Sequence, residues 1–194
     1  MHKPLKLHLQ KFTNASEEEL EKFCQLFEYK EVSKKSFLLE EGQICRFEAF
    51  VLDGLLKVFL QDANAHEQIL FFAAADWWVT DFDSFDNQIP ATLGIQALED
   101  TKLLTISYEN KKWALENLPF VPPIFFAMIK RTHIALQRRF IKNLSQTADV
   151  RYTDFLRQYP HIAHRLSNIQ IAAYLGVSHE FVSKIRNKIT KSLP

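Results

Sequence analysis

Apolar residues recur with a helical period at both ends of this chain and with a period close to two in its middle. Leu20, Phe23 and Phe27 form one helical stripe, which follows a possible cap at Asn14 or Ser16 and three glutamates that favour a helix start. The middle of the chain consists of short β-prone runs at roughly ten-residue spacing, which predicts a compact antiparallel β-roll or barrel. These runs are 29–39, 47–60, 67–73, 92–97 and 103–106.

Turn residues divide the β-prone runs. Glu41-Gly42 and Asp53-Gly54 are both acid–glycine pairs, and the second pair predicts a hairpin because Asp-Gly suits a tight two-residue turn. A third turn is expected at residues 62–65.

Helical periodicity returns at Ser107, which can cap a short helix through Leu115. A long helix is then predicted from about Pro123 to Leu144, because proline is tolerated in a first turn. This helix is apolar on more than one side, so it needs a second surface to bury against. A dimer partner is the expected surface, and a core helix of a monomer is the alternative. The expected dimerisation residues are Phe125, Ile129, Thr132, Leu136 and Phe140.

Residues 167–189 carry the most specific pattern of the chain, after a further helical segment at 149–158 that Pro160 ends. Ser167 can cap one short helix, Gly176 can supply the positive φ at its end, and Ser178 can cap a second helix. Apolar residues of both helices then face each other, with a small residue, Ala172, where they approach. This pattern predicts a helix-turn-helix.

The second helix of this pair leaves a polar face outside. Its candidate DNA-binding residues are Ser178, His179, Glu180, Ser183, Lys184, Asn187 and Lys188. Glu180 can accept a hydrogen bond from cytosine, Lys184 can contact guanine or a phosphate, and Lys188 can contact the backbone. The alternatives are a solvated helix exterior and a helical hairpin that only packs.

Charge is distributed unevenly, although the 194 residues carry a formal net charge of only +1. Residues 1–115 hold 12 basic and 19 acidic side chains, whereas residues 116–194 hold 12 basic and 4 acidic ones. Such asymmetry suggests a C-terminal part that meets a polyanion, or two parts that neutralise each other.

Apolar stretches are too short to span a membrane and the N-terminus lacks a signal peptide, so a cytoplasmic protein is expected. Cys24 and Cys45 are too far apart for a CxxC motif, which argues against a zinc site or disulfide framework.

The whole chain resembles the Crp/Fnr family of bacterial transcriptional regulators. Residues 171–178 (Ile-Ala-Ala-Tyr-Leu-Gly-Val-Ser) followed by 182–186 (Val-Ser-Lys-Ile-Arg) look like the DNA-reading unit of that family. Residues 95–100 and 104–107 look like the last strands of its sensor domain. The family pattern Arg-Glu-Thr-Val-x-Arg reads here from His179 to Lys184, so two arginines are replaced and a different operator is expected, because lysine lacks the two-pronged contact of arginine.

The resemblance implies an α+β fold in which successive parts of the chain have different functions. Residues 1–118 would form a β-roll sensor like a cyclic-nucleotide-binding domain, 119–145 a dimerisation helix, and 146–194 a nearly all-helical DNA-binding domain. It implies a homodimer that binds double-stranded DNA at a roughly palindromic operator. It also implies contact with RNA polymerase.

The phosphate-binding segment of cyclic-nucleotide-binding members is altered in this chain. Ala91 stands where that segment has an arginine, Thr80 replaces a glycine, and the acidic residues Asp83 and Asp86 lie close by. A phosphate among carboxylates is disfavoured, so weak or no binding of cyclic AMP is expected. The nearby aromatic residues either fill the core or line a pocket for an unknown small-molecule effector. The candidate effector residues are Trp78, Thr80, Asp81, Phe82, Ala91 and Thr92.

Other functions find less support. A small-molecule or cyclic-nucleotide sensor whose helical tail contacts proteins is the main alternative, and it would show no salt-dependent affinity for DNA. A metal-dependent β-barrel enzyme would need a histidine cluster, whereas His66-Glu67 stands alone. His66 and His133 remain possible heme ligands. The chain shows no hydrolase, nucleotide-loop or carboxylate-pair motif, so we expect neither catalytic residues nor a bound metal.

Overall fold

The computed structural model describes residues 1–62, 64 and 66–191, with side chains on the last helix described as far as Lys188. Contacts divide the chain into two compact units: Met1–Leu60 with Phe71–Thr132, and Gln61–Leu70 with His133–Pro194. The described helices are α1 (Lys3–Leu9), α2 (Glu17–Cys24), α3 (Phe82–Asn87), α4 (Tyr108–Asn117), α5 (Val121–Ser145), α6 (Ala148–Gln158), α7 (Pro160–Ala163), α8 (Asn168–Leu175) and α9 (His179–Lys191). The described strands are β1 (Glu28–Val32), β2 (Phe37–Leu39), β3 (Phe47–Asp53), β4 (Leu55–Gln61), β5 (Glu67–Ala74), β6 (Trp78–Val79), β7 (Gly94–Ala97) and β8 (Thr101–Ser107).

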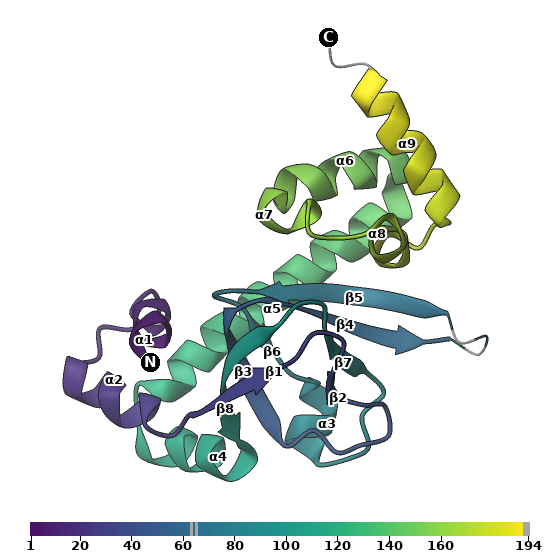
Figure 1. Cartoon of the computed structure of the whole chain (residues 1–194). Coiled ribbons are helices and arrows are strands. Elements are labelled where there is room, and N and C mark those ends of the chain that lie inside the picture. The colour runs from purple at the N-terminus through teal and green to yellow at the C-terminus, as the bar shows by residue number, and fades with distance from the viewer. Residues whose placement is uncertain (63, 65, 192–194) are drawn as a thin grey trace. The chain divides into compact units, whose positions relative to one another are not determined.

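The strands form two antiparallel sheets, with orders β1-β8-β3-β6 and β2-β7-β4-β5. Figure 1 labels the strands of both sheets. One core lies between the sheets, where Ala49, Val51 and Leu103 pack with residues of β4 and β7. The alternate residues Phe50 and Leu104 point the other way and pack against α1, α2 and the start of α5. This alternation follows from the period of two of a strand. The predicted α+β fold with a β-roll is confirmed.

The Asp53-Gly54 pair does not form the predicted hairpin. It joins β3 to β4, which lie in different sheets, so the chain crosses from one layer to the other at this point. Gly54 has φ +99°, and a Cβ there would lie 2.7 Å from the carbonyl oxygen of Asp100. A glycine is therefore required at this corner by close backbone approach as well as by positive φ. Instead of pairing with each other, β3 pairs with β8 and β4 pairs with β7.

The N-terminal helix α1 was not among the predicted elements. Leu5 and Leu9 lie on one face of α1, are fully buried, and join the core formed by Leu20 and Phe23 of α2. The predicted start of α2 is confirmed, because Ser16 and Glu19 form a reciprocal capping box. Cys24 is buried and unpaired in this core, and burial raises the pKa of its thiol to about 12.

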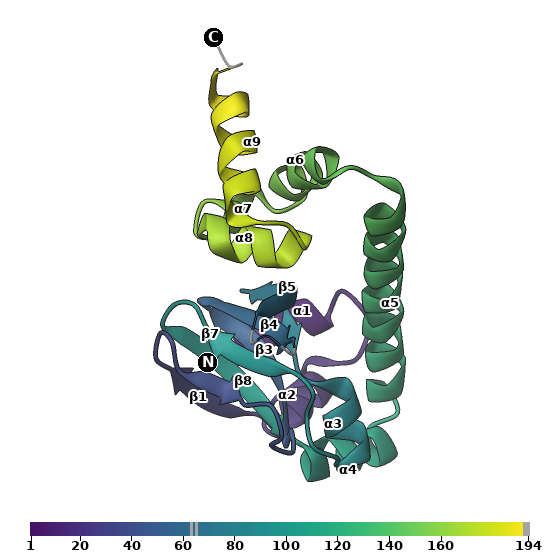
Figure 2. The ribbon, with the colours of Figure 1, turned by 90° about the vertical axis from the view of Figure 1, so that its right-hand side faces the viewer.

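The long helix α5 begins at Val121 with Pro122 and Pro123 in its first turn, close to the predicted start. Residues of α5 up to Thr132 belong to the first unit and those from His133 to the second. Figures 1 and 2 show α6 to α9 following α5 along the chain. The predicted helix at 149–158 corresponds to α6, whereas the short helix α7 after it was not predicted. None of the described helices is long and apolar enough to cross a membrane.

Candidate nucleic-acid interface

The helices α8 and α9 pack against each other through a small apolar core. Ile171, Ala172 and Leu175 of α8 are at most 5% exposed, and Val182 and Ile185 of α9 are at most 7% exposed. The apolar spacing of α9 continues to Ile189, whose side chain lies outside the described residues. Val182 and Ile185 agree with the predicted helix-turn-helix packing, whereas Phe181, which the apolar pattern also places on the buried face of α9, is 36% exposed.

Local backbone signals fix the turn between these helices. Ser167 caps α8 in a capping box with Gln170, and α8 ends at Gly176, which has φ +68°. The amide of Val177 then donates to the carbonyl of Ala172 at 3.1 Å, which closes the helix end. Ser178 accepts from the amide of Phe181 at 3.3 Å at the start of α9. Each of these residues has the role that the sequence pattern predicts.

The outer face of α9, which we define as His179, Glu180, Lys184, Asn187 and Lys188, is exposed. Glu180, Lys184 and Asn187 are four and three residues apart, so they lie on one line along the helix. This line points away from the apolar core. The carboxylate of Glu180, the ammonium of Lys184 and the amide of Asn187 therefore follow one another along the exposed side of the helix.

Ser183 differs from the other candidate DNA-binding residues. It is half-buried, and its hydroxyl accepts a hydrogen bond from the side-chain amide of Asn168 at 3.1 Å. The same Asn168 accepts from the guanidinium of Arg186 at 2.8 Å. Ser183 and Arg186 therefore tie α9 to the start of α8, a positioning role that the sequence pattern did not reveal.

The carboxylate of Glu180 lies in the first turn of α9 and is exposed. Its pKa is lowered by a hydrogen bond from its own backbone N–H, and further by the Ser178 hydroxyl, His179 and Lys184. The imidazole Nε2 of His179 lies 3.2 Å from Oε1 of Glu180. The positive end of the helix dipole favours an anion at this place.

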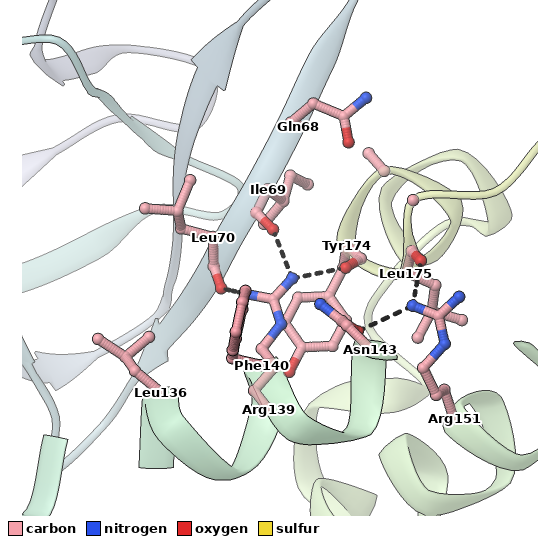
Figure 3. A pocket seen from close by; sticks show the side chains of 12 residues that line it. Gln68, Ile69, Leu70, Leu136, Arg139, Phe140, Asn143, Arg151, Tyr174 and Leu175 are labelled. Carbon is pink, nitrogen blue, oxygen red and sulfur yellow. Dashed lines mark hydrogen bonds between the residues drawn. The ribbon is translucent and has the colours of Figure 1, made fainter. Parts of the chain in front are cut away.

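The half-buried Arg139 of α5 contacts α8 and β5, and Figure 3 shows its surroundings. The guanidinium of Arg139 donates to the carbonyl oxygens of Leu70, of Ile69 at 3.1 Å and of Tyr174 at 2.7 Å. It also lies 4.0 Å from the centre of the Tyr174 ring, and burial lowers its pKa. Arg151 of α6 donates to the Leu175 carbonyl at 2.9 Å. Both arginines line a cavity of about 430 Å³ within the second unit.

The candidate effector residues do not come together in one open site. Thr80, Asp81 and Ala91 are at most 4% exposed, whereas Phe82 is 40% exposed and Thr92 is exposed. Asp81 caps α3 by accepting from the amide of Ser84 at 3.2 Å, and its other oxygen accepts from the amide of Leu93 at 3.3 Å. Protein groups therefore occupy both oxygens of this carboxylate.

Trp78 belongs to a different part of the unit from Asp81. Its ring lies 5.5 Å from Phe50 and 5.8 Å from Phe125, in the core between the first sheet and the helices. Of the two interpretations of the aromatic cluster, Trp78 fits the one in which aromatic side chains fill the core.

The expected dimerisation residues divide into two groups. Phe125 is 4% exposed and packs in the core of the first unit, so it is not on the free face of α5. Ile129, Leu136 and Phe140 are 48%, 48% and 65% exposed, and Thr132 is exposed. Phe126 is 71% exposed, so it is this neighbour, and not Phe125, that lies on the exposed side of α5. The exposed residues of this set are accordingly Phe126, Ile129 and Thr132 in the first unit and Leu136 and Phe140 in the second, where Leu136 and Phe140 also line the cavity beside Arg139. We call these five residues the outer face of α5.

No protein-family profile and no curated protein sequence matches this chain. Several solved structures do match its fold. The regulator CLP of Xanthomonas campestris, described as responsive to c-di-GMP, has a TM-score of 0.75 at 14% identity over 91% of this chain and 92% of its own. A putative transcriptional regulator of the Crp/Fnr family from Eubacterium rectale has a TM-score of 0.73 at 17% identity, over 93% and 86%. The catabolite activator protein of Thermus thermophilus has a TM-score of 0.58 at 20% identity, over 93% and 86%. The chain therefore has the fold of Crp/Fnr regulators.

Proposed function

We propose that this chain is a DNA-binding transcriptional regulator, which binds double-stranded DNA as a homodimer through the outer face of α9. The observation that carries the proposal is the helix pair α8 and α9, which buries its apolar residues and exposes an acceptor, a cation and an amide along one line. A recognition helix that enters a major groove needs this combination of a fixed support and a free polar face. The fold shared with Crp/Fnr regulators supports the same function.

The dimer part of the proposal rests on the outer face of α5. Phe126, Ile129, Leu136 and Phe140 recur at spacings of three, seven and four residues, close to the heptad pattern of a coiled coil. Large apolar side chains that are half or more exposed favour association, because a partner removes them from water. Two copies of α9 would then meet two half-sites of a palindromic operator, about 34 Å apart.

The proposed sensor does not depend on cyclic AMP. Ala91 offers no cation to a phosphate, and the buried carboxylate of Asp81 already accepts the backbone amides of Ser84 and Leu93. Titration calorimetry with cyclic AMP should show no saturable heat. Micromolar binding would contradict this part of the proposal and leave DNA binding untouched.

Selection of DNA from a random pool tests the main proposal. We expect enrichment of a symmetric motif, with an affinity that falls as salt rises. Lys184→Ala should weaken binding about tenfold, since it removes a contact from the outer face of α9. Lys112→Ala on α4, an exposed lysine far along the chain from α9, is the matched control and should bind as the wild type does.

Two results would overturn the proposal. One is no enrichment at low salt, which would favour the alternative of a helical tail that contacts proteins. The other is enrichment that is lost equally in Lys112→Ala. Sedimentation tests the dimer separately: Phe140→Glu should give monomers, whereas Trp113→Glu, a change at an exposed aromatic residue of α4, should not.

A further inference from the structure

Asn168, the first residue of α8, forms side-chain hydrogen bonds with two residues of α9. We propose that Asn168 positions one of them, Arg186, as a contact for a DNA phosphate beside the outer face of α9. This inference rests on the proposed function, because it concerns how the helix pair α8 and α9 meets DNA. Arg186 is not among the candidate DNA-binding residues that the sequence pattern indicates.

The side-chain amide of Asn168 bridges the two helices in a defined orientation. Its Nδ2 donates to Oγ of Ser183 at 3.1 Å, and its Oδ1 accepts from Nη1 of Arg186 at 2.8 Å. A guanidinium only donates hydrogen bonds, so the amide oxygen must face Arg186 and the amide nitrogen must face Ser183. Asn168 and Ser183 are half-buried, whereas Arg186 is exposed. The supporting residues are thus partly shielded from water, and the guanidinium that they hold lies at the surface.

Arg186 lies on the side of α9 that meets the start of α8. His179, Ser183 and Arg186 are four and three residues apart, so they form one line along the helix. This line lies one residue before the line that begins at Glu180, and the two lines therefore run side by side. In a helix-turn-helix on DNA, the second helix enters the major groove while the first helix crosses the sugar–phosphate backbone. A cation held at the first residue of α8 would accordingly meet the backbone and not the base edges.

The charge of this part of the chain favours a phosphate. Residues 155–194 contain six Lys or Arg and a single acidic residue, Glu180. The helix α8 itself contains no acidic residue. A guanidinium also has the planar fork of donors that fits a phosphate. Arg186 therefore has both the charge and the shape for this ligand.

The hydrogen bond to Asn168 prepares Arg186 for binding. Ordering a long side chain when a complex forms weakens affinity by about two- to tenfold. Because Asn168 already restricts Arg186 in the free protein, less of this loss remains when DNA binds. The bond to Asn168 uses one of the five N–H donors that a guanidinium carries.

The test measures how the affinity of the full chain for a duplex enriched from the random pool changes with salt concentration. Arg186→Leu should lower the slope of log affinity against log salt by about 0.9 for each protomer bound, the value for one phosphate contact on duplex DNA. At about 0.15 M salt, this corresponds to a loss of about fivefold per protomer. The matched control is Arg46→Leu, which removes an exposed arginine of the first unit and should keep the wild-type slope.

Two substitutions of Asn168 test its positioning role. Asn168→Asp keeps an acceptor for Arg186 but pairs the guanidinium with a carboxylate, so the salt slope should fall as it does in Arg186→Leu. Its melting temperature should stay at or above that of the wild type, because an acidic residue is favoured in the first turn of a helix. Asn168→Ala leaves the charge of Arg186 in place, so it should keep the slope and lose about threefold in affinity. In the Arg186→Leu background, Asn168→Ala should cause no further loss.

The outcomes separate this inference from the proposed function. If Arg186→Leu keeps the wild-type slope while Lys184→Ala weakens binding, Arg186 is not a phosphate contact and DNA binding stands. If Asn168→Ala weakens binding equally with and without Arg186, the positioning role is overturned. Absence of duplex binding by the wild type at every salt concentration would overturn both proposals. Circular dichroism melting shows whether each variant is folded, and if Arg186→Leu fails to fold, the slope of Asn168→Asp decides.

Discussion

The indole N–H of Trp78 donates a hydrogen bond to Nε2 of His8 at 3.2 Å, which ties the N-terminal helix to the first sheet. Nε2 can accept this bond only when it carries no proton, so the contact requires a neutral imidazole. The other ring nitrogen, Nδ1, lies 3.6 Å from a carboxylate oxygen of Asp76. Burial lowers the pKa of His8, and the nearby Asp76 opposes this shift.

Stability should therefore fall on mild acidification. Because the folded-state pKa of His8 lies below its unfolded value of about 6.5, the unfolded chain takes up the proton first. The contribution of His8 is complete above about pH 6.5 and is lost as the pH falls toward the folded-state pKa. Urea unfolding at a series of pH values should show this loss in the wild type and a flatter profile in His8→Gln. His2→Gln, on the residue that precedes α1, should keep the wild-type profile; if it flattens equally, the Trp78 contact is not the cause.

A buried ion pair joins β3 to α4. Nζ of Lys111 lies 2.7 Å from Oε2 of Glu48, and these side chains are 7% and 1% exposed. Lys111→Met would leave a buried carboxylate without its cation, at a cost of about 3–5 kcal/mol in the free energy of unfolding. We expect Lys112→Met, at the exposed neighbouring position, to change it by less than about 0.5 kcal/mol.

The pH dependence of Lys111→Met provides a second measurement. Burial raises the pKa of Glu48, and loss of Lys111 removes the charge that opposes this shift. Its folded-state pKa then lies above the unfolded value, so the variant is most stable below about pH 4.3 and loses stability as the pH rises through the folded-state pKa. Equal destabilisation at acidic and neutral pH would contradict this explanation.

Arg139 should be irreplaceable by lysine. A lysine keeps the charge but not the fork that reaches the carbonyls of Ile69 and Tyr174. Arg139→Lys should lower the free energy of unfolding of the second unit by about 2 kcal/mol. Arg138→Lys, at the exposed neighbouring position, should have little effect in the same urea titration. Similar losses in both variants would show that the carbonyl contacts contribute little.

Gly176 should resist substitution for conformational reasons. Its φ is +68°, and a Cβ there would meet nothing within 4 Å, so the cost of Gly176→Ala is backbone strain of about 1 kcal/mol. Gly176→Asn should cost less, because asparagine tolerates the left-handed region. Thermal melting of both variants measures the difference, and equal losses would point to a packing role for this position.

Local signals let the sequence determine much of the helix-turn-helix. Three signals act within a few residues of one another and can therefore be predicted from sequence: the cap at Ser167, the glycine at 176, and the apolar spacing of Val182 and Ile185. The same holds for Ser16 and the start of α2. The outer face of α9 follows, because a fixed helical period leaves His179, Glu180 and Lys184 outside once the buried side is known.

Tertiary structure decided the features that join distant segments. Asp53-Gly54 has the composition of a hairpin turn, yet pairing of β3 with β8 and of β4 with β7 made it a corner between sheets. Phe125 and Phe126 are adjacent and chemically identical, and only packing against Phe23 and Trp78 buries the first and leaves the second free. Arg139 meets carbonyls about 35 and 70 residues away in the chain, a contact that no local pattern encodes. Local sequence thus determined the capped helix ends and the apolar side of the helix-turn-helix, whereas the choice among long-range partners depended on which contacts could be buried together.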